Sequence, residues 1–246
     1  NRNLFKNFYI GCIRNLMLQH QLDRIIRLIL IRFNIPLYVR NQIVQLSRTF
    51  DERFEIENFM TIEEQEFLLN FAVNNKDWDY TKDTINENGV VLYQASVWKD
   101  RVASLPTLSQ YAPSVVNLIY KMIERLKIEV DKEFKINAKA TSPAIVRWPP
   151  GTRQEPHADK EFHEGPNAGT PNAFPYYDMA SIFYINDNYE GGELYFPIQG
   201  IEFKPKARAV YFFPGDKNFI HGVRPVISGT RYTSPFFWTI LEHKGE

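Results

Sequence analysis

Hydrophobic positions follow a helical period near the start of the chain. Leu4, Phe8, Cys12 and Leu16 recur at nearly helical spacing, and similar spacing continues to residue 33. This pattern predicts a helix over residues 4–33.

Two more helices are predicted further along. Thr61 followed by Glu64 has the form of a capping box, which predicts a helix over residues 61–74. Pro113 suits the first turn of a helix, and the apolar period after it extends to about residue 130.

The last hundred residues have a different pattern of apolar and polar positions. Short apolar runs are broken by proline and glycine, and the segment 165–175 reads as a loop. Many short strands at regular spacing favour a sandwich or jelly roll over a parallel α/β sheet. The expected strands span residues 142–148, 154–159, 179–185, 193–197, 201–203, 208–213, 219–223 and 231–240.

Charge divides the chain in two. Residues 1–50 carry eight basic side chains against one acidic side chain, which leaves 21 basic and 28 acidic residues for the rest. We therefore expect a basic helical extension over residues 1–50 and one domain over residues 51–246. The amphipathic stretch 22–33 fits a helix that contacts a partner or a membrane surface. It fits equally a helix whose apolar face packs on the main domain.

Composition excludes several classes of protein. The formal net charge is zero, which gives no overall attraction to nucleic acid. No run of 18 uncharged apolar residues is present, so no transmembrane helix is expected. The single cysteine, Cys12, excludes an intramolecular disulfide and fits a reducing, cytoplasmic location. The chain starts at Asn1 rather than Met, which suggests a fragment or a processed chain.

Five polar residues suggest the chemistry. Two imidazoles and one carboxylate hold iron(II) on one face and leave the other positions open, and His157, Asp159 and His221 supply that set. Strand alternation would point His157 and Asp159 the same way. Arg231 and Thr233 share one face of the final strand, where the guanidinium and the hydroxyl could bind the far carboxylate of a 2-oxodicarboxylate.

The simpler interpretation is that these residues are structural. A His-x-Asp triplet alone is a weak signal, and His221 alone could be a hydrogen-bonded core histidine. The conjunction with Arg231 is more specific, because the charges of iron(II), Asp159, 2-oxoglutarate and Arg231 would balance in a buried site. Glu161 and His163 are competing ligands on the same segment, but they precede the Gly/Pro loop and are expected to be solvated.

Several motifs, in order and spacing, resemble one enzyme family. Residues 142–240 resemble the prolyl 4-hydroxylase-like branch of the iron(II)/2-oxoglutarate dioxygenases. This resemblance implies a mostly β fold with α (α+β), a double-stranded β-helix or jelly roll backed by helices. The matching motifs include residues 144–148, 156–159, 183–187, 191–197, 203–206, 210–214, 221–226 and 229–232.

The resemblance also implies roles for individual residues. It implies that His157, Asp159 and His221 are the iron ligands and that Arg231 binds the C5 carboxylate of 2-oxoglutarate. Tyr184 matches a position whose phenol often bonds the same carboxylate.

The chain departs from the family pattern at two positions. Many collagen-type members have lysine where Arg231 stands, so this chain follows the arginine variant. Trp148 occupies a position usually held by tyrosine, which removes a hydroxyl near the co-substrate. Gly191 and Gly192 are expected to make a turn with positive φ.

The expected activity is hydroxylation of a C–H bond, coupled to decarboxylation of 2-oxoglutarate to succinate. Fe(II), 2-oxoglutarate and O2 are the expected cofactors, with ascorbate as a possible addition, and no catalytic residue is expected beyond the metal site. The resemblance favours a peptidyl proline, with segments 79–100 and 160–177 as covering loops. Candidates for an aromatic substrate wall are Trp98, Trp148, Tyr176, Tyr177 and Phe237, and each could equally be ordinary packing.

Three alternatives remain open from the sequence. The substrate could be a free amino acid or a small metabolite. The domain could be a catalytically silent jelly-roll binding module, although the complete ligand set argues against it. Nucleobase demethylation is disfavoured, because residues 51–246 are net acidic and lack a basic footprint for phosphate.

Overall fold

The computed structural model describes residues 54–79, 84–85, 87, 89, 91–93 and 95–243. These residues lie within one compact unit, residues 53–246. The predicted extension over residues 1–50, with Cys12, lies outside them, and the predicted covering loop 79–100 is described only in part. No helix of the described residues combines the length and the hydropathy that a membrane span needs.

Three α-helices are observed in the described residues. α3 (Ile62–Asn74) begins with the predicted capping box, in which Thr61 Oγ1 accepts from the Glu64 N–H at 3.1 Å and Glu64 Oε2 accepts from the Thr61 N–H at 2.9 Å. α5 (Pro113–Glu133) starts at the predicted proline. α4 (Leu105–Tyr111) was not predicted, because its seven residues are too few to show a period.

The strands form two principal antiparallel sheets. The larger sheet has the order β1-β12-β8-β15-β6-β4, with β5 also paired to β15, and the smaller has the order β11-β10-β13-β7. Two sheets wrapped in this way, with helices against one of them, confirm the predicted jelly roll. The strands of the larger sheet are β1 (Phe54–Ile56), β4 (Val102–Ala103), β5 (Ile136–Ala140), β6 (Ile145–Trp148), β8 (Met179–Tyr184), β12 (Val210–Pro214) and β15 (Arg231–His243). Those of the smaller sheet are β7 (Gln154–His157), β10 (Leu194–Phe196), β11 (Ile201–Phe203) and β13 (His221–Val223).

Short elements complete the described fold. Two-stranded pairs are formed by β2 (Thr84–Ile85) with β3 (Val91–Tyr93) and by β9 (Glu190–Gly191) with β14 (Val226–Ser228). The 3-10 turns are η1 (Ala95–Trp98) and η2 (Lys217–Phe219). Gly191 and Gly192 have the expected positive φ, 71° and 68°, and a Cβ on Gly191 would lie 2.2 Å from the Pro225 carbonyl oxygen. Only glycine fits this turn.

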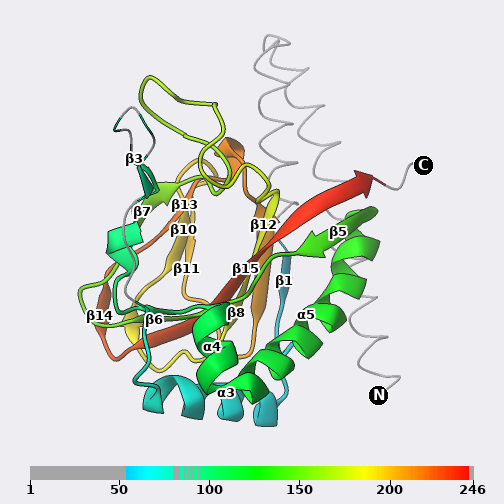
Figure 1. Cartoon of the computed structure of the whole chain (residues 1–246), viewed down its shortest axis with the longest axis vertical. Coiled ribbons are helices and arrows are strands. Elements are labelled where there is room, and N and C mark those ends of the chain that lie inside the picture. Colours follow the sequence, from blue (N-terminus) through cyan, green and yellow to red (C-terminus); the bar gives the residue numbers. More distant parts are fainter. Residues whose placement is uncertain are drawn as a thin grey trace, which may run out of the picture. The chain divides into compact units, whose positions relative to one another are not determined.

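Successive side chains of the long strand β15 point to opposite faces of the larger sheet. Phe236 and Trp238 point to one face, where they pack with buried residues of α3 and α5 in the main core. The helices lie against this face of the larger sheet (Figure 1). Arg231, Thr233 and Phe237 point to the opposite face and line a cavity between the sheets. The same strand therefore anchors the core and builds the site.

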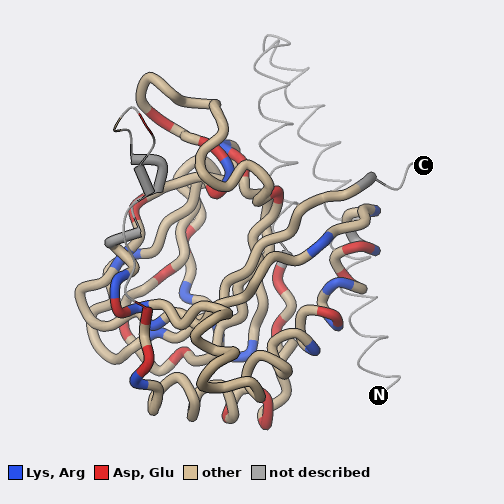
Figure 2. Tube along the Cα trace, viewed as in Figure 1, with Lys and Arg blue, Asp and Glu red and all other residues tan. Residues whose placement is uncertain are grey.

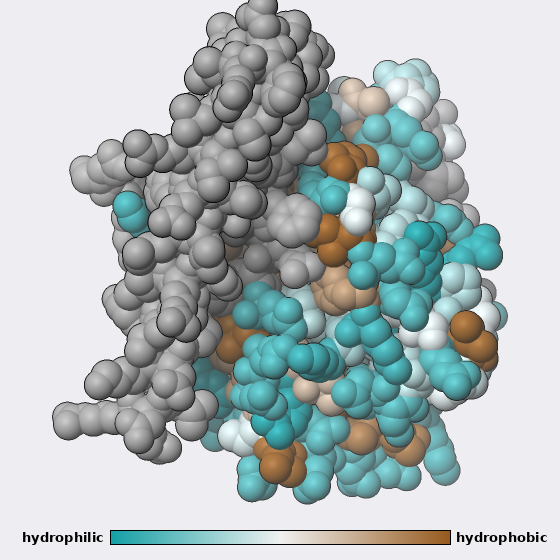
Figure 3. All heavy atoms as spheres, turned by 180° about the vertical axis from the view of Figure 1, so that it is seen from behind, coloured by the Kyte–Doolittle hydropathy of each residue, from teal (hydrophilic) through white to brown (hydrophobic). Residues whose placement is uncertain are grey.

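The charged residues lie largely outside these layers. Figure 2 shows acidic and basic positions interspersed along α5 rather than gathered into a stripe of one sign. Figure 3 shows that the described surface seen from behind is mostly hydrophilic, with hydrophobic residues scattered over it.

The predicted strands agree with observed ones except at some ends. The predicted strand 154–159 ends at His157, and the predicted strand 219–223 begins with η2 and becomes regular only at His221. The short strands β1, β4, β9 and β14 were missed, and so was β5. Most of them have two or three residues, which is too short for alternation to be recognised.

Candidate metal centre and its cavity

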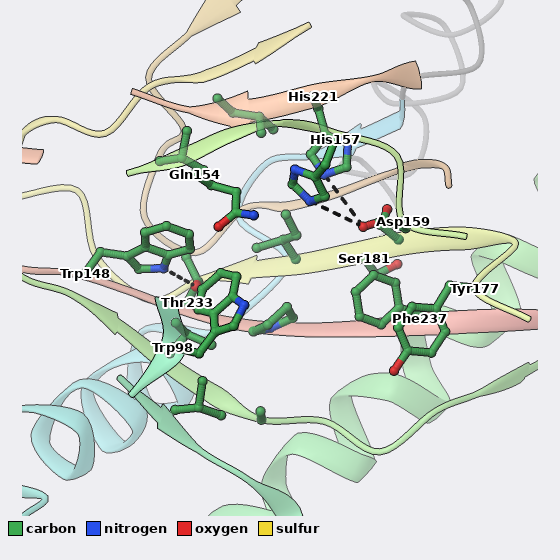
Figure 4. A pocket seen from close by; sticks show the side chains of 18 of the residues that line it. Trp98, Trp148, Gln154, His157, Asp159, Tyr177, Ser181, His221, Thr233 and Phe237 are labelled. Carbon is green, nitrogen blue, oxygen red and sulfur yellow. Dashed lines mark hydrogen bonds and ion pairs between the residues drawn. The ribbon is translucent and has the colours of Figure 1, made fainter. Parts of the chain in front are cut away.

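Three side chains that are remote in sequence meet at one end of the cavity. His157 is the last residue of β7, His221 is the first residue of β13, and the two residues are direct partners across the smaller sheet. Asp159 Oδ1 lies 3.7 Å from Nε2 of His157 and 3.9 Å from Nε2 of His221 (Figure 4). One donor atom from each residue lies within 4.8 Å of the others. The structure thus assembles the predicted triad.

Asp159 reaches this position from a bend rather than from the strand. The expectation that it shares β7 with His157 was wrong, because the strand ends two residues earlier. The Gly215 carbonyl oxygen accepts from the Asp159 N–H at 2.9 Å and from the Lys160 N–H at 3.1 Å. Asn172 Nδ2 donates to the Asp159 carbonyl oxygen at 2.9 Å. These backbone contacts, not strand alternation, aim the carboxylate at the imidazoles.

Both imidazoles are held with the same nitrogen facing the carboxylate. The Nδ1 of His157 lies 2.9 Å from the Glu155 carbonyl oxygen, and the Nδ1 of His221 lies 3.0 Å from that of Phe219. A carbonyl oxygen only accepts, so each Nδ1 carries the proton and each Nε2 keeps a free lone pair. Burial lowers the pKa of both rings, more strongly for His221 than for His157, whose side chain is 31% exposed. At neutral pH both imidazoles are therefore uncharged, and each can ligate a metal ion through its Nε2 lone pair.

The carboxylate lacks a counter-charge of its own. Asp159 is 8% exposed, and its Oδ2 has no hydrogen-bond partner among the described residues. Burial raises the pKa of Asp159 to about 8. The Nε2–Oδ1 separations are too long for hydrogen bonds, whereas ligands about 2.1 Å from a shared ion lie roughly 3–4 Å apart. The spacing, the free lone pairs and the orphaned oxygen all fit a divalent cation.

A buried, positively charged side chain, Arg231, lies elsewhere on the wall of the same cavity. Arg231 is 1% exposed, and its Nη2 donates to the Tyr184 hydroxyl at 3.0 Å. Its Nε and Nη1 have no hydrogen-bond partner, and no carboxylate pairs with it within the described part of the chain. A buried guanidinium without an anion is costly, so this end of the cavity suits an anionic ligand.

The cavity between these two ends has a volume of about 260 Å³. Trp148 forms part of its wall, and the Trp148 Nε1 donates to Thr233 Oγ1 at 3.2 Å. The Trp148 ring centroid also lies 4.7 Å from the guanidinium carbon of Arg231. The indole therefore supplies a donor where the family pattern has a tyrosine hydroxyl. Because Thr233 accepts from the indole, its own hydroxyl proton is left to donate elsewhere.

A second, larger cleft of about 630 Å³ adjoins the first. Its inner end is shared with the cavity and carries Trp98, Tyr177 and Phe237, which were predicted as part of an aromatic wall. The rings of Tyr177 and Phe237 stack with centroids 3.8 Å apart and planes 4° apart. Tyr176 lines neither space. The predicted covering loop over residues 160–177 contributes much of the outer wall.

Glu161 and His163 are half-buried on the wall of this outer cleft, and neither belongs to the triad. Glu161 Oε1 accepts from the Lys217 N–H at 2.7 Å. Two further residues were missed from the sequence. Gln154 lines both spaces, and Tyr189 is buried beside Arg231. Neither belongs to a recognisable motif, so no sequence signal marked them.

Comparison with known proteins agrees with this geometry. Residues 143–239 match the family model of the 2OG-Fe(II) oxygenase superfamily. No curated protein sequence matches the chain. A prolyl hydroxylase from Trichoplax adhaerens, solved with a hypoxia-inducible factor peptide fragment, is 14% identical, with a TM-score of 0.54 over 92% of this chain and 93% of that one. The viral collagen prolyl hydroxylase of Paramecium Bursaria Chlorella virus-1 is 16% identical, with a TM-score of 0.50 over 78% and 97%.

The chain thus carries a 2OG-Fe(II) oxygenase domain on a prolyl hydroxylase-like fold. The domain is a 2-oxoglutarate-dependent dioxygenase, and the family that residues 143–239 match uses Fe(II), 2-oxoglutarate and O2.

Metal binding is predicted to release protons in a pH-dependent way. A ligating carboxylate must be ionised, whereas metal-free Asp159 has a pKa of about 8. We expect binding of Co(II) to release about 0.9 proton at pH 7 and about a quarter of a proton at pH 8.5. Calorimetric titration in buffers of different ionisation enthalpy measures this number. Equal release at both pH values would contradict the assignment.

Gly215 is predicted to be required for the position of Asp159. A Cβ at residue 215 would lie 2.2 Å from the Tyr177 carbonyl oxygen and 3.2 Å from Asp159 Cβ. Gly215→Ala should destabilise the fold by about 1–3 kcal/mol and weaken Co(II) binding by roughly tenfold or more.

Gly200→Ala is the matched control for this substitution. Its added methyl meets no atom within 4 Å, and it carries only the strain of φ 64°. The control should lose some thermal stability and keep the wild-type affinity for Co(II). Equal affinities in both variants would rule out the role of Gly215.

Proposed function

We propose that this dioxygenase domain hydroxylates a prolyl residue within a peptide. In this proposal His157, Asp159 and His221 hold iron(II), and Arg231 with Tyr184 and Thr233 holds 2-oxoglutarate. The observation that carries the proposal is that the wall of one cavity holds two buried ionisable side chains, Asp159 and Arg231, which have no charged partner among the described residues. A cation at the first and a dicarboxylate reaching the second would together neutralise the site.

The metal end requires rigid, correctly protonated ligands. Bound iron(II) supplies the centre at which dioxygen oxidises 2-oxoglutarate to succinate and carbon dioxide and at which the substrate C–H bond is hydroxylated. The residues around it fix the geometry. Glu155 and Phe219 hold the imidazole tautomers through their carbonyl groups, and Gly215 holds the backbone of Asp159.

The co-substrate end offers several donors to one carboxylate. Arg231 presents a guanidinium whose Nε and Nη1 are unused, and the Tyr184 hydroxyl accepts from its Nη2. Because that phenol accepts from arginine, its own proton can be donated to the same anion. Trp148 orients the Thr233 hydroxyl. Buried guanidinium and hydroxyl donors favour a dicarboxylate over a monocarboxylate of equal length.

The character of the inner end of the outer cleft supports a peptide substrate. Besides His157 and Asp159, this shared end is lined by uncharged residues, Trp98, Gln154, Tyr177 and Phe237. A free amino acid would bring an ammonium and a carboxylate to this neutral region, and both would need counter-charges. Arg153 and Glu155 lie on the cleft wall, and they pair with each other at 2.5 Å. Aromatic side chains with a few neutral polar groups suit a prolyl ring within a peptide.

The structural neighbours also support a peptide substrate. One of them was solved with a peptide bound, and the other is named as a collagen prolyl hydroxylase. Hydroxylation of a free amino acid remains the alternative within the enzyme class, and a silent binding module the alternative outside it.

The uncharged inner end of the outer cleft predicts which class of substrate the enzyme accepts. With Fe(II), ascorbate and 2-oxoglutarate, succinate formation should rise with N-acetyl-prolinamide and more strongly with proline-rich peptides, but not with free proline. The reason is that the first two ligands carry no charges at the proline. Stimulation by free amino acids alone would favour the metabolite alternative. Bound metal and 2-oxoglutarate without any turnover would favour a silent module.

Arg231 is predicted to set the choice of 2-oxoacid. The wild type should bind 2-oxoglutarate about a hundredfold more tightly than 2-oxovalerate, which has the same length without the second carboxylate. Arg231→Met should remove this preference, because no other charged group has been assigned to that carboxylate. Equilibrium titration of the Mn(II)-loaded protein measures both affinities.

Arg224→Met provides the control for this titration. Arg224 is an exposed arginine that pairs with Glu202 at 2.7 Å, so its loss should leave the preference unchanged. A preference that survives in Arg231→Met would refute the proposed co-substrate site.

A further inference from the structure

The pairing of β7 with β13 contains an irregularity beside the metal site. His221 pairs with His157 and Val223 pairs with Gln154, so a step of two residues on β13 faces a step of three on β7. This extra residue is a β-bulge. In a regular strand, Gln154 and His157 would point to opposite faces, because their spacing is odd.

The bulge turns Gln154 to the same side as His157. His221 and Val223 both line the cavity, and their partners across the sheet do the same. Figure 4 shows the side-chain amide of Gln154 extending into the cavity, between the imidazoles and Trp148. Bulges beside active sites commonly re-aim a side chain in this way. The distortion of β7 therefore has a visible consequence, which is one polar group added to the wall.

The chemistry of that group is specific. A primary amide offers a donor and an acceptor at once. Within the described residues the Gln154 amide hydrogen-bonds to no protein group, and it is not sealed from the cavity. Gln154 lines both the inner cavity and the outer cleft, so a substrate entering from the cleft toward the triad passes it.

We infer that Gln154 is a substrate-recognition residue that pairs with one backbone peptide group of the substrate. Its amide oxygen accepts the N–H of that peptide group. The peptide group concerned is the one that follows the target proline, because the bond that precedes proline has no N–H. This inference rests on the proposed function and makes it more specific, since it names the contact that distinguishes a peptide from a free amino acid.

The inference is tested with a double-mutant cycle between the protein and the substrate. The protein is wild type or Gln154→Met, which keeps the length of the side chain and removes both hydrogen-bonding groups. The substrate is a proline-rich peptide in which the bond after the target proline is either an amide or an ester, which lacks the N–H. Peptide-stimulated succinate formation gives kcat/KM for each of the four combinations.

We expect each single change to lower kcat/KM by about tenfold to a hundredfold, the effect of leaving one hydrogen-bonding group unpaired. Both changes together should cost little more than either one alone, because they remove the same interaction. Multiplying losses would overturn the inference while leaving the proposed function standing. A wild type that no peptide stimulates would overturn the proposed function and this inference with it.

Two controls exclude a general loss of structure. Gln110 is exposed on α4, and Gln110→Met should behave as the wild type with both peptides. Co(II) binding by Gln154→Met reports whether the metal site is still assembled. A variant that no longer binds Co(II) is replaced by Gln154→Leu, which also removes both hydrogen-bonding groups. Amide and ester peptides that remain distinguishable by tenfold with that variant would also contradict the inference.

Discussion

The site depends on a buried carboxylate, Asp159, that faces two neutral imidazoles and no positive side chain. Such a group is expensive in a metal-free protein, and burial raises its pKa to about 8. In the part of the chain that the structure describes, no lysine or arginine pairs with this carboxylate. The structure fixes the carboxylate and both imidazoles through backbone carbonyl groups instead. At neutral pH the metal-free carboxyl group is mostly protonated, and a divalent cation held by the three side chains would favour its ionised form.

The jelly roll makes this arrangement possible because one face of its larger sheet packs against the helices and the other face lines the cavity. Alternate residues of β15 pack under the helices, and the others line the cavity with Arg231 and Thr233. The second sheet brings His157 and His221 opposite each other across one strand pair. The smaller sheet therefore contributes two metal-ligating imidazoles and the larger sheet a buried guanidinium to a cavity of about 260 Å³. The core on the far side of the larger sheet holds β15 in place.

Much of this could be predicted from the sequence, where local patterns are strong. The capping box at Thr61, the proline at the start of α5 and the alternation along β15 all specified the observed elements. The triad was also predicted, although for a partly wrong reason. Asp159 lies in a bend held by Gly215, a residue 56 positions later in the sequence. No local periodicity encodes such a contact.

Gln154 and Tyr189 were not predicted as site residues, because non-local contacts place them. Gln154 faces the cavity because of a bulge, and a regular strand would have turned it away. Tyr189 lies beside Arg231 because the tight turn at Gly191 and Gly192 follows it, and that packing is tertiary. The basic extension over residues 1–50 stays a prediction.

The position of a bound ion tests the central claim most directly. Anomalous diffraction from crystals of the protein grown with Mn(II) and 2-oxoglutarate without dioxygen locates the ion without reference to activity. The account predicts one strong peak about 2.0–2.2 Å from His157 Nε2, Asp159 Oδ1 and His221 Nε2. It also predicts that the far carboxylate of 2-oxoglutarate contacts Arg231. A peak that lacks Asp159 as a ligand, or an ion bound elsewhere while the triad stays empty, would contradict it.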